Sequence, residues 1–450
     1  MSTTKKHFTV LGAGAVGVCT ALYLLRDGHP VTLLDRLPPG KGCSFGNAGL
    51  IQTGACVPIA TPGVLRDVPR MLLDPDGPLV IRWQHLPSLL PYLLGFVLAA
   101  RARRVEEISV ALQAILNHAM EAYRVLLAEA GANDLVRRSG ELYVYERQAS
   151  YDRAKPWHDL RRKRGVEVVD LAPEELRQLE PALAPIFCKG VYLPDSVQTL
   201  NPYMVTAALA ENFARNGGEI VQEEVREIAM GAGGPTALLT DKGRRKIDQL
   251  VIATGAFSKR WARQLAGYLP LDTERGYHLM LPRPNIDLRV PLLSGDYRFG
   301  LVPMVDGIRL AGTAELATLD APPRYARAER LLKIAERMLP GLSGEARTRW
   351  MGHRPSTPDS LPVIGRSPRF ASVYLAFGHG HLGLTLGAVT GRLIADLASG
   401  RIPPLSLAPY DIRRFGWIRR EGCRSLVPRT RSSPSLERET GGELRVPEGH

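Results

Sequence analysis

Cysteine is scarce in this chain of 450 residues, and the five cysteines are scattered: Cys19, Cys43, Cys56, Cys188 and Cys423. None forms a CxxC pair, which excludes a disulfide scaffold and a zinc motif and favours a reducing compartment. No other metal-ligand spacing appears, so we expect no metal site. No uninterrupted apolar run reaches the roughly 18 residues that a transmembrane helix needs.

Acidic residues are outnumbered, because 58 Lys and Arg stand against 45 Asp and Glu, a net charge of +13. This excess would suit nucleic acid, an anionic membrane or acidic substrates, or it is an Arg-rich solvated surface, which we favour. Aromatic and basic residues are not interleaved as in single-strand binders, so we expect no nucleic-acid partner. The length fits two or three domains, and 45% hydrophobic and 23% charged residues are ordinary for a globular protein.

The N-terminal region could be mistaken for a signal peptide, because Lys5 and Lys6 precede an apolar stretch. Glycines interrupt that stretch, which favours a strand over 7–11, a tight turn, a helix over 16–27 and a second strand over 31–34. This is a β-turn-α-β pattern within about 30 residues, the size of a βαβ unit.

The turn carries a GxGxxG motif. Gly12 permits the tight turn, Gly14 lets the backbone approach a pyrophosphate, and Gly17 lets helix and strand pack closely. Asp35 ends the second strand, where a carboxylate can accept hydrogen bonds from ribose hydroxyls. We therefore predict a dinucleotide site with contacts at Gly12, Gly14, Ala15, Val16, Gly17, Asp35 and Arg36.

Two later segments favour FAD over NAD. A strand over 249–253 runs into a small-residue turn that contains Thr254 and Gly255. Near the C-terminus, a strand over 373–376 leads through a turn rich in glycine and histidine into a helix over 383–398. The N–H groups of that helix would stabilise an anionic reduced flavin ring.

The rest of the chain is read from periodicity and stop signals. We expect helices over 105–130, over 202–216 with Asn201 as N-cap, and over 325–338, and strands over 140–145, 219–228 and 237–240. Short strands and loops are expected between 263 and 349. Residues 417–450 are rich in Arg, Ser, Glu, Pro and Gly, so we expect a disordered tail.

An ordered set of motifs resembles the FAD-dependent D-amino-acid oxidase superfamily and, within it, the small-subunit group of bacterial D-amino-acid dehydrogenases. The motifs are spread over residues 8–415 and comprise Gly12–Gly17, Ser44–Gly49, Ala253–Gly255, Arg275–Tyr277, Arg354–Asp359 and Gly378–Gly383. The resemblance implies an α/β fold, with a glutathione-reductase-type FAD-binding Rossmann domain and an inserted α+β substrate domain. It would divide the chain into an FAD-binding domain (1–58, 198–262 and 350–416) and a substrate domain (59–197 and 263–349).

The resemblance also implies further cofactor contacts: Ser44, Asn47, Ala48 and Gly49 near the pyrophosphate and flavin, Val225 on the adenosine side, and Gly378, Gly380, Gly383, Leu384 and Thr385 at the flavin. The cysteine that attaches flavin in sarcosine-oxidase relatives is not evident here, because His353 precedes Arg354. We therefore expect non-covalent FAD.

Oxidation of an amino acid at Cα needs orientation more than acid–base groups, because hydride passes to flavin N5 as C=N forms. The substrate carboxylate is best held by an arginine fork, and our candidate is Arg354, although it would alternatively pair with Asp359. Tyr277 would bind the carboxylate or close the site, or be a half-buried strand tyrosine. His278 and His379 would tune amine protonation, or be structural histidines.

These observations predict FAD-dependent oxidation of a D-amino acid, or a cyclic one such as D-hydroxyproline, to an imino acid and then a 2-oxo acid. Electrons would pass to a quinone or another acceptor. The nearest alternative is a glycine- or sarcosine-type amine oxidase that uses oxygen. A flavin-containing nucleic-acid-binding protein and a non-catalytic flavin subunit are more distant alternatives.

One segment bears on location. Residues 86–104 are almost wholly apolar and end in Arg101, Arg103 and Arg104. They form either a buried helix or a plug that dips into the interface of an anionic membrane. We expect a cytoplasmic protein with peripheral contact to the inner face of the plasma membrane.

Overall fold

A mainly parallel sheet is built around the N-terminal strand, and its order is β10-β2-β1-β14-β21-β20. The structure, a computed structural model, describes residues 5–65, 68, 79–343 and 347–416, so the tail predicted over 417–450 lies outside the described residues. The strands are β1 (Phe8–Leu11), β2 (Val31–Asp35), β10 (Glu219–Gln222), β14 (Gln249–Ile252), β20 (Val363–Arg366) and β21 (Val373–Phe377). Only β20 runs antiparallel to its neighbour within this sheet. This is the Rossmann-like α/β arrangement that the sequence predicts.

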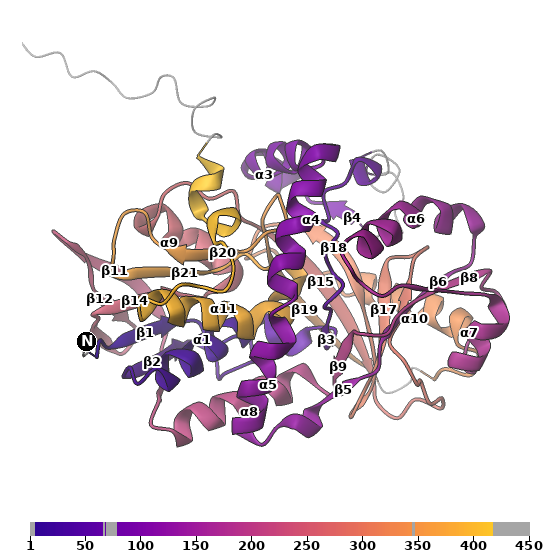
Figure 1. Ribbon diagram of the computed structural model, residues 1–450, viewed down its shortest axis with the longest axis horizontal. Helices are drawn as coiled ribbons and strands as arrows, with labels where there is room; N and C mark the ends of the chain where they lie inside the picture. Colours follow the sequence, from indigo (N-terminus) through magenta and orange to yellow (C-terminus); the bar gives the residue numbers. More distant parts are fainter. Residues whose placement is uncertain (1–4, 66–67, 69–78, 344–346, 417–450) are drawn as a thin grey trace, which may run out of the picture.

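Five helices from separate parts of the chain cover this sheet (Figure 1). They are α1 (Ala15–Arg26), α4 (Ala102–Leu116), α5 (Ala119–Ala130), α8 (Pro202–Arg215) and α11 (Gly383–Ala398). At Gly391, α11 meets α1 so closely that an added Cβ would lie 2.6 Å from the Cys19 carbonyl oxygen. Buried side chains of α1, α4, α5, α8 and α11 share one hydrophobic core with the sheet.

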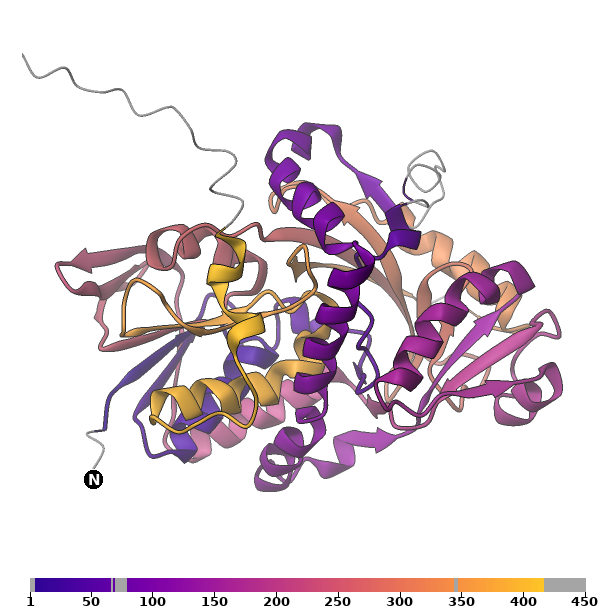
Figure 2. The ribbon, with the colours of Figure 1, turned by 45° about the horizontal axis from the view of Figure 1, so that its top comes forward.

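A second, larger sheet lies beside the first, in the order β19-β15-β18-β17-β16-β6-β8-β7, with β4 paired to β18 (Figures 1 and 2). Its strands are β4 (Leu79–Ile81), β6 (Glu141–Tyr145), β7 (Val169–Leu171), β8 (Lys189–Leu193), β15 (Asp272–Leu281), β16 (Leu292–Ser294), β17 (Phe299–Met304), β18 (Gly307–Leu316) and β19 (Thr348–Ser356). The helices α6 (Gln148–Lys163), α7 (Pro173–Leu179) and α10 (Ala326–Met338) lie around it, and α10 packs into its core.

Two small sheets complete the fold. Strands β11 (Val225–Gly231), β12 (Gly234–Thr240) and β13 (Gly243–Lys246) form an antiparallel ribbon, and β9 (Val197–Thr199) pairs with β3 (Leu50–Ile51) and β5 (Val136–Arg138). The short helix α9 (Ser258–Leu265) follows β14.

Three sequence predictions need correction. The helix expected over 105–130 is two helices, α4 and α5, which break at Asn117–His118 although the apolar periodicity continues across the break. The strand expected over 219–228 is divided between β10 and β11, which belong to different sheets. The region 263–349 contains the long strands β15 and β18, each of ten residues, rather than only short ones.

The helix predictions over 202–216 and 325–338 are confirmed, and the Asn201 side chain accepts from Tyr203 N–H as the predicted N-cap. The proposed domain boundaries stay a prediction. Although 102–130 lies within the segment assigned to the substrate domain, α4 and α5 pack into the core of the parallel sheet.

The apolar segment forms the helix α3 (Leu86–Ala99), which projects at the edge of the molecule in both views (Figures 1 and 2). One face, with Leu89 and Tyr92, is buried against Leu316. No one helix in the described part of the chain is both long and apolar enough to cross a bilayer, whereas Trp83–Ala99 and Ala102–Ala130, bent by 93°, meet those criteria only as a pair.

Candidate functional site

A cleft of about 610 Å³ lies between the two large sheets. One wall consists of the carboxyl ends of parallel strands β1, β2, β14 and β21, represented by Gly12, Asp35, Ala253 and Phe377. The other wall is contributed by β15 and β19. Ligands of open α/β sheets bind at this edge of the strands, so the cleft is where the sequence places a cofactor.

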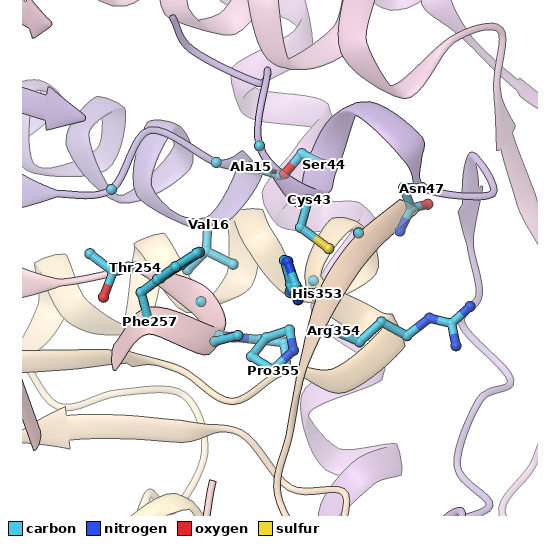
Figure 3. A pocket seen from close by; sticks show the side chains of 18 of the residues that line it. Ala15, Val16, Cys43, Ser44, Asn47, Thr254, Phe257, His353, Arg354 and Pro355 are labelled. Atoms are coloured by element: carbon cyan, nitrogen blue, oxygen red, sulfur yellow. Dashed lines mark hydrogen bonds between the residues drawn. The ribbon is translucent and has the colours of Figure 1, made fainter. Parts of the chain in front are cut away.

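The predicted glycine turn forms one end of the cleft. Gly12 has a φ of +109°, and a Cβ there would lie 2.7 Å from the Ala253 carbonyl carbon. Gly14, Ala15 and Val16 line the cleft directly (Figure 3). Gly17 is not among the described lining residues; a Cβ on it would lie 2.9 Å from the Gly12 carbonyl carbon, so it lets helix and turn pack.

The N-terminus of α1 points its free N–H groups into the cleft. Gly14 is the N-cap and has no side chain to bond them, and the first turn carries no acidic residue. The Ser44 hydroxyl oxygen accepts from Ala15 N–H at 2.9 Å, which leaves its own proton free to donate. Such a helix end binds phosphate through unpaired amides and the positive end of its dipole.

Asp35 lines the end of the cleft beside the glycine turn. Its carboxylate accepts from Ala13 N–H at 2.7 Å and from Leu37 N–H at 3.0 Å, which fixes the carboxylate beside the glycine turn. The Arg36 guanidinium lies 4.6 Å from the centre of the Phe257 ring. Val225 also lines this part of the cleft.

The loop after β2 supplies a third side. Ala48 and Asn47 line the cleft, and the Asn47 amide oxygen accepts from Gly49 N–H at 2.8 Å. Gly49 lies outside the described lining and has a φ of +77°, which lets the chain turn into β3.

The C-terminal turn supplies the opposite side, where Gly380, Gly383 and Leu384 line the cleft together with Thr254 and Gly255 of the turn after β14. Helix α11 begins at Gly383, as predicted.

Two residues predicted at this turn lie outside the lining that the structure describes. Gly378 has a φ of +80° and shapes the turn. The Thr385 hydroxyl donates to the Leu50 carbonyl at 3.3 Å and accepts from Gln52 N–H at 3.2 Å, so it ties α11 to the end of β3.

Arg354 lies on β19 and reaches into the cleft with about a quarter of its side chain exposed, 24%. Its Nη1 donates to Glu274 Oε1 at 3.0 Å and to the Thr313 carbonyl at 3.1 Å. The alternative pairing with Asp359 is wrong, because Asp359 binds Arg414 at 2.9 Å. The guanidinium lies over Gly276, where a Cβ would be 2.5 Å from Cζ. One edge of the fork is therefore anchored and the rest is available to an anion.

Tyr277 also borders the cleft, but its hydroxyl is engaged elsewhere. It donates to Glu315 and accepts from Arg324 N–H at 3.0 Å, and the side chain is buried. Glu315 also pairs with the buried Arg275 at 3.3 Å and with Arg82 at 2.7 Å. In this arrangement Tyr277 stabilises the wall of the cleft through a buried charge network.

The two histidines do not titrate where we expected. Burial lowers the pKa of His379 to about 3, and its Nε2 is 2.9 Å from the Thr390 hydroxyl. Burial and the Arg309 charge lower the pKa of His278 to about 3, and this ring stacks on Trp350. His379 borders the cleft, whereas His278 is not among the lining residues that the structure describes. Both are neutral near pH 7, so neither changes charge in the range that would follow amine protonation.

Sequence reasoning missed several lining residues, among them Cys43, Gln52 and His353. Cys43 points toward His353 across the cleft, and burial lowers the pKa of His353 to about 4 (Figure 3). The Gln52 amide donates to Glu141 Oε2 at 2.6 Å. Cys43 and His353 adjoin the predicted Ser44 and Arg354 in sequence, which was the one signal for them; Gln52 had none.

The residues present fit a dinucleotide whose two ends differ. The glycine turn, the N-terminus of α1 and the Asp35 carboxylate lie at one end, and the N-terminus of α11 and the anchored Arg354 lie at the other.

Comparisons with known proteins agree with this geometry. Residues 7–397 match the family model described as FAD dependent oxidoreductase (DAO). A protein of Bradyrhizobium diazoefficiens named D-amino-acid oxidase is 38% identical over 418 residues, 91% of this chain and 99% of its own length. A D-amino acid dehydrogenase of Paramagnetospirillum magneticum is 32% identical over 416 residues, covering 90% of this chain and 98% of the relative.

Solved structures share the fold at lower identity. Glycine oxidase from Geobacillus kaustophilus superposes with a TM-score of 0.69 at 22% identity, over 92% of this chain and 99% of that chain. L-proline dehydrogenase from P. horikoshii gives a TM-score of 0.69 at 20% identity, over 92% and 98%. These similarities bear on the fold alone.

Proposed function

We propose that this chain, which belongs to the FAD dependent oxidoreductase (DAO) family, oxidises a D-amino acid to an imino acid. Water then converts the imino acid into a 2-oxo acid and ammonia. Family membership makes the protein an FAD-dependent oxidoreductase, and the resemblance read from the sequence is thereby confirmed. The D-amino-acid substrate is proposed from the names of the curated relatives and from the cleft.

The residues to which we assign cofactor contacts line the cleft from the glycine turn to the start of α11. Gly12, Gly14 and Ser44 would hold the pyrophosphate, Asp35 the ribose, and the start of α11 at Gly383 the flavin. FAD supplies, when bound, the acceptor for the two electrons of the Cα–H bond. We propose non-covalent attachment.

The position of the Arg354 guanidinium is the observation that best supports a substrate with a carboxylate group. Its guanidinium is anchored by Glu274 at 3.0 Å and presents its remaining N–H groups to the cleft. A planar fork binds both oxygens of a carboxylate, which orients the α-carbon and holds the substrate in one pose. As the substrate becomes an imine it loses the Cα hydrogen with its electron pair and one N–H proton, and its carboxylate stays bound to Arg354 throughout.

Two acceptors for the electrons are compatible with this site. We propose a quinone or another carrier, in line with the relatives named dehydrogenases. The relative named an oxidase favours a second candidate, an amine oxidase of the glycine or sarcosine type that uses oxygen. Peroxide release by the purified protein favours the oxidase; dye or quinone reduction without peroxide favours the dehydrogenase. Cyclic substrates such as D-hydroxyproline belong in the same substrate panel.

The function is tested by anaerobic bleaching of the yellow holoenzyme with D- and L-amino acids, glycine and proline derivatives. We expect D-amino acids to bleach the flavin, and Arg354→Ala to keep the colour and lose bleaching. Arg366→Ala, which removes an arginine on β20 that binds Tyr374 instead, is the matched control. Normal bleaching of Arg354→Ala by D-amino acids would refute the carboxylate assignment.

We further propose that α3 makes peripheral contact with an anionic membrane. Trp83, Leu90, Leu94 and Val97 are 72%, 56%, 50% and 49% exposed. They recur at helical spacing on the face opposite the buried Leu89, and exposed arginines follow at 101 and 103. An apolar face beside cations matches the interface of a bilayer with acidic headgroups.

Sedimentation with vesicles of phosphatidylcholine, with and without phosphatidylglycerol, tests this contact. We expect binding that requires the anionic lipid and falls about thirtyfold or more in Leu90→Glu/Leu94→Glu, because each of the two partly buried leucines contributes about 1 kcal/mol or more. Val305→Glu, at a residue 62% exposed elsewhere, should bind as the parent does. Equal pelleting of all three proteins would contradict the proposal.

A further inference from the structure

We propose that the Gln52 amide oxygen is the acceptor that holds the substrate amine, and that the buried Glu141 is a positioning residue that fixes the amide in this orientation. This inference rests on the proposed oxidation of amino acids and deepens it, because it assigns the second of the two groups that every such substrate presents.

The Gln52 backbone is held at the cleft. Its N–H donates to the Thr385 hydroxyl at 3.2 Å, and that hydroxyl donates to the Leu50 carbonyl at 3.3 Å. Gln52 is therefore tied to the first turn of α11, beside Leu384, and it lines the cleft. Because these bonds fix the backbone, the Gln52 side chain starts from a defined position at the cleft.

Glu141 sets which end of the amide faces the cleft. Its carboxylate is 1% exposed and lies at the start of β6, with Oε2 2.6 Å from Gln52 Nε2. Because Gln52 Nε2 is the atom that donates to this carboxylate, the amide carbonyl oxygen must lie on the side away from Glu141.

The neighbours of Glu141 offset part of the cost of burying its charge. Burial raises the pKa of Glu141, whereas the Gln52 amide and the charge of Arg161 lower it. Arg161 comes from α6 and donates to the Tyr143 hydroxyl at 3.3 Å, while Tyr143 lies two residues along β6 from Glu141. The carboxylate thus has a donor on one side and a cation behind it.

Three other polar side chains of the cleft that could receive an amine already have partners. The Asn47 amide oxygen accepts from Gly49 N–H at 2.8 Å, and the Tyr277 hydroxyl donates to Glu315. His379 Nε2 is bonded to Thr390 at 2.9 Å. The Gln52 amide, by contrast, uses its nitrogen to bind Glu141, which leaves its carbonyl oxygen to accept from an amine.

A neutral acceptor suits the chemistry better than an acidic one. The amine must lose its extra proton before electrons leave the Cα–H bond. A carboxylate would stabilise the ammonium form and raise its pKa, whereas an amide oxygen accepts from either form without adding a charge. Gln52 therefore orients the amine while leaving it easy to deprotonate.

Full-length holoenzyme with D-alanine tests the proposal, and propionate serves as a competitor that has the carboxylate and lacks the amine. For Gln52→Leu we expect KM for D-alanine to rise about tenfold, the cost of one lost hydrogen bond to a polar group, with propionate inhibition and FAD content unchanged. For the exchange Gln52→Glu/Glu141→Gln, which moves the single carboxylate of the pair beside the amine, we expect the acidic limb of the kcat/KM profile to move up by about one pH unit, because the adjacent anion holds the ammonium form.

Two further variants separate positioning from folding. Glu141→Gln frees the Gln52 amide to adopt either orientation, so kcat/KM should fall about threefold with no loss of FAD. Gln148→Leu removes the amide of a matched glutamine–carboxylate pair, Gln148 with Asp152 at 2.8 Å on α6, and should behave as the parent.

The outcomes are distinct. If the parent bleaches with D-alanine and Gln52→Leu weakens D-alanine and propionate equally, or loses FAD, the assignment of Gln52 to the amine is wrong and the proposed oxidation stands. An unshifted pH profile in Gln52→Glu/Glu141→Gln overturns the assignment in the same way. If the parent bleaches with no amino acid, the proposed function fails and this inference fails with it.

Discussion

Gly276→Ala should disable substrate binding without touching the cofactor. Gly276 lies on β15 directly under the Arg354 guanidinium, and an added Cβ would fall 2.5 Å from Cζ and 2.9 Å from Nε. Carbon atoms in contact need about 3.5 Å, so the guanidinium must move by roughly 1 Å. Its anchor to Glu274 at 3.0 Å would be strained or broken.

The size of the effect follows from that displacement. A misplacement of about 1 Å in a positioning group costs on the order of a hundredfold in rate, and loss of one charged hydrogen bond costs about 1.5–3 kcal/mol. We therefore expect kcat/KM for a D-amino acid to fall between tenfold and a few hundredfold in Gly276→Ala. FAD content should be unchanged, since Gly276 is remote from the glycine turn of β1.

The assay is stopped-flow reduction of the bound flavin under anaerobic conditions across a range of D-alanine concentrations. Gly300→Ala is the matched control, because Gly300 lies on β17 of the same sheet and the one atom of the described residues closer than 3.5 Å to its added Cβ would be a Leu293 methyl carbon at 3.0 Å, which can rotate away. Equal kinetics for Gly276→Ala and Gly300→Ala would refute the argument that the guanidinium must rest on a bare backbone.

Two further predictions concern stability. His379 binds a proton below about pH 6.5 when unfolded but only near pH 3 when folded, so it makes the fold less stable as pH falls from 6.5 toward 3, by up to about 1.4 kcal/mol per pH unit. Urea midpoints at pH 6.5 and pH 5 should therefore differ less in His379→Asn than in the parent, and an unchanged difference would contradict the cause given. Gly391→Ala places a Cβ 2.6 Å from the Cys19 carbonyl oxygen, so α1 and α11 must separate. We expect a loss of about 1–3 kcal/mol in urea unfolding, against little change for Gly233→Ala, at an exposed turn between β11 and β12 where an added Cβ meets no atom of the described residues within 4 Å; equal midpoints for parent and Gly391→Ala would show that the helices are not in close contact there.

Local patterns were readable from the sequence because local geometry produces them. Gly12 and Asp35 could be assigned because a βαβ unit places both at the same sheet edge within a short stretch of chain. Helix α11 was located from its preceding strand and glycine-rich turn, and it begins at the predicted Gly383.

Non-local pairs could not be read in this way. Arg354 pairs with Glu274, 80 residues away, and Gln52 pairs with Glu141, 89 residues away. No periodicity connects such positions, so the partner of Arg354 was sought nearby at Asp359. The long strands β15 and β18 were missed for a related reason, since they are buried on both faces and lack the alternation that marks a half-exposed strand.

The order of the strands in the parallel sheet has a consequence for biosynthesis. Strand β1 emerges first from the ribosome, yet its neighbour β14 and that strand's neighbour β21 are made some 240 and 360 residues later. Until α11 has been translated, the apolar surface of α1 that it covers lacks this partner, and the cleft lacks the side formed by Gly383 and Leu384. We therefore expect stable cofactor binding only once α11 has been synthesised, and expect a nascent chain stalled before residue 383 to retain no flavin.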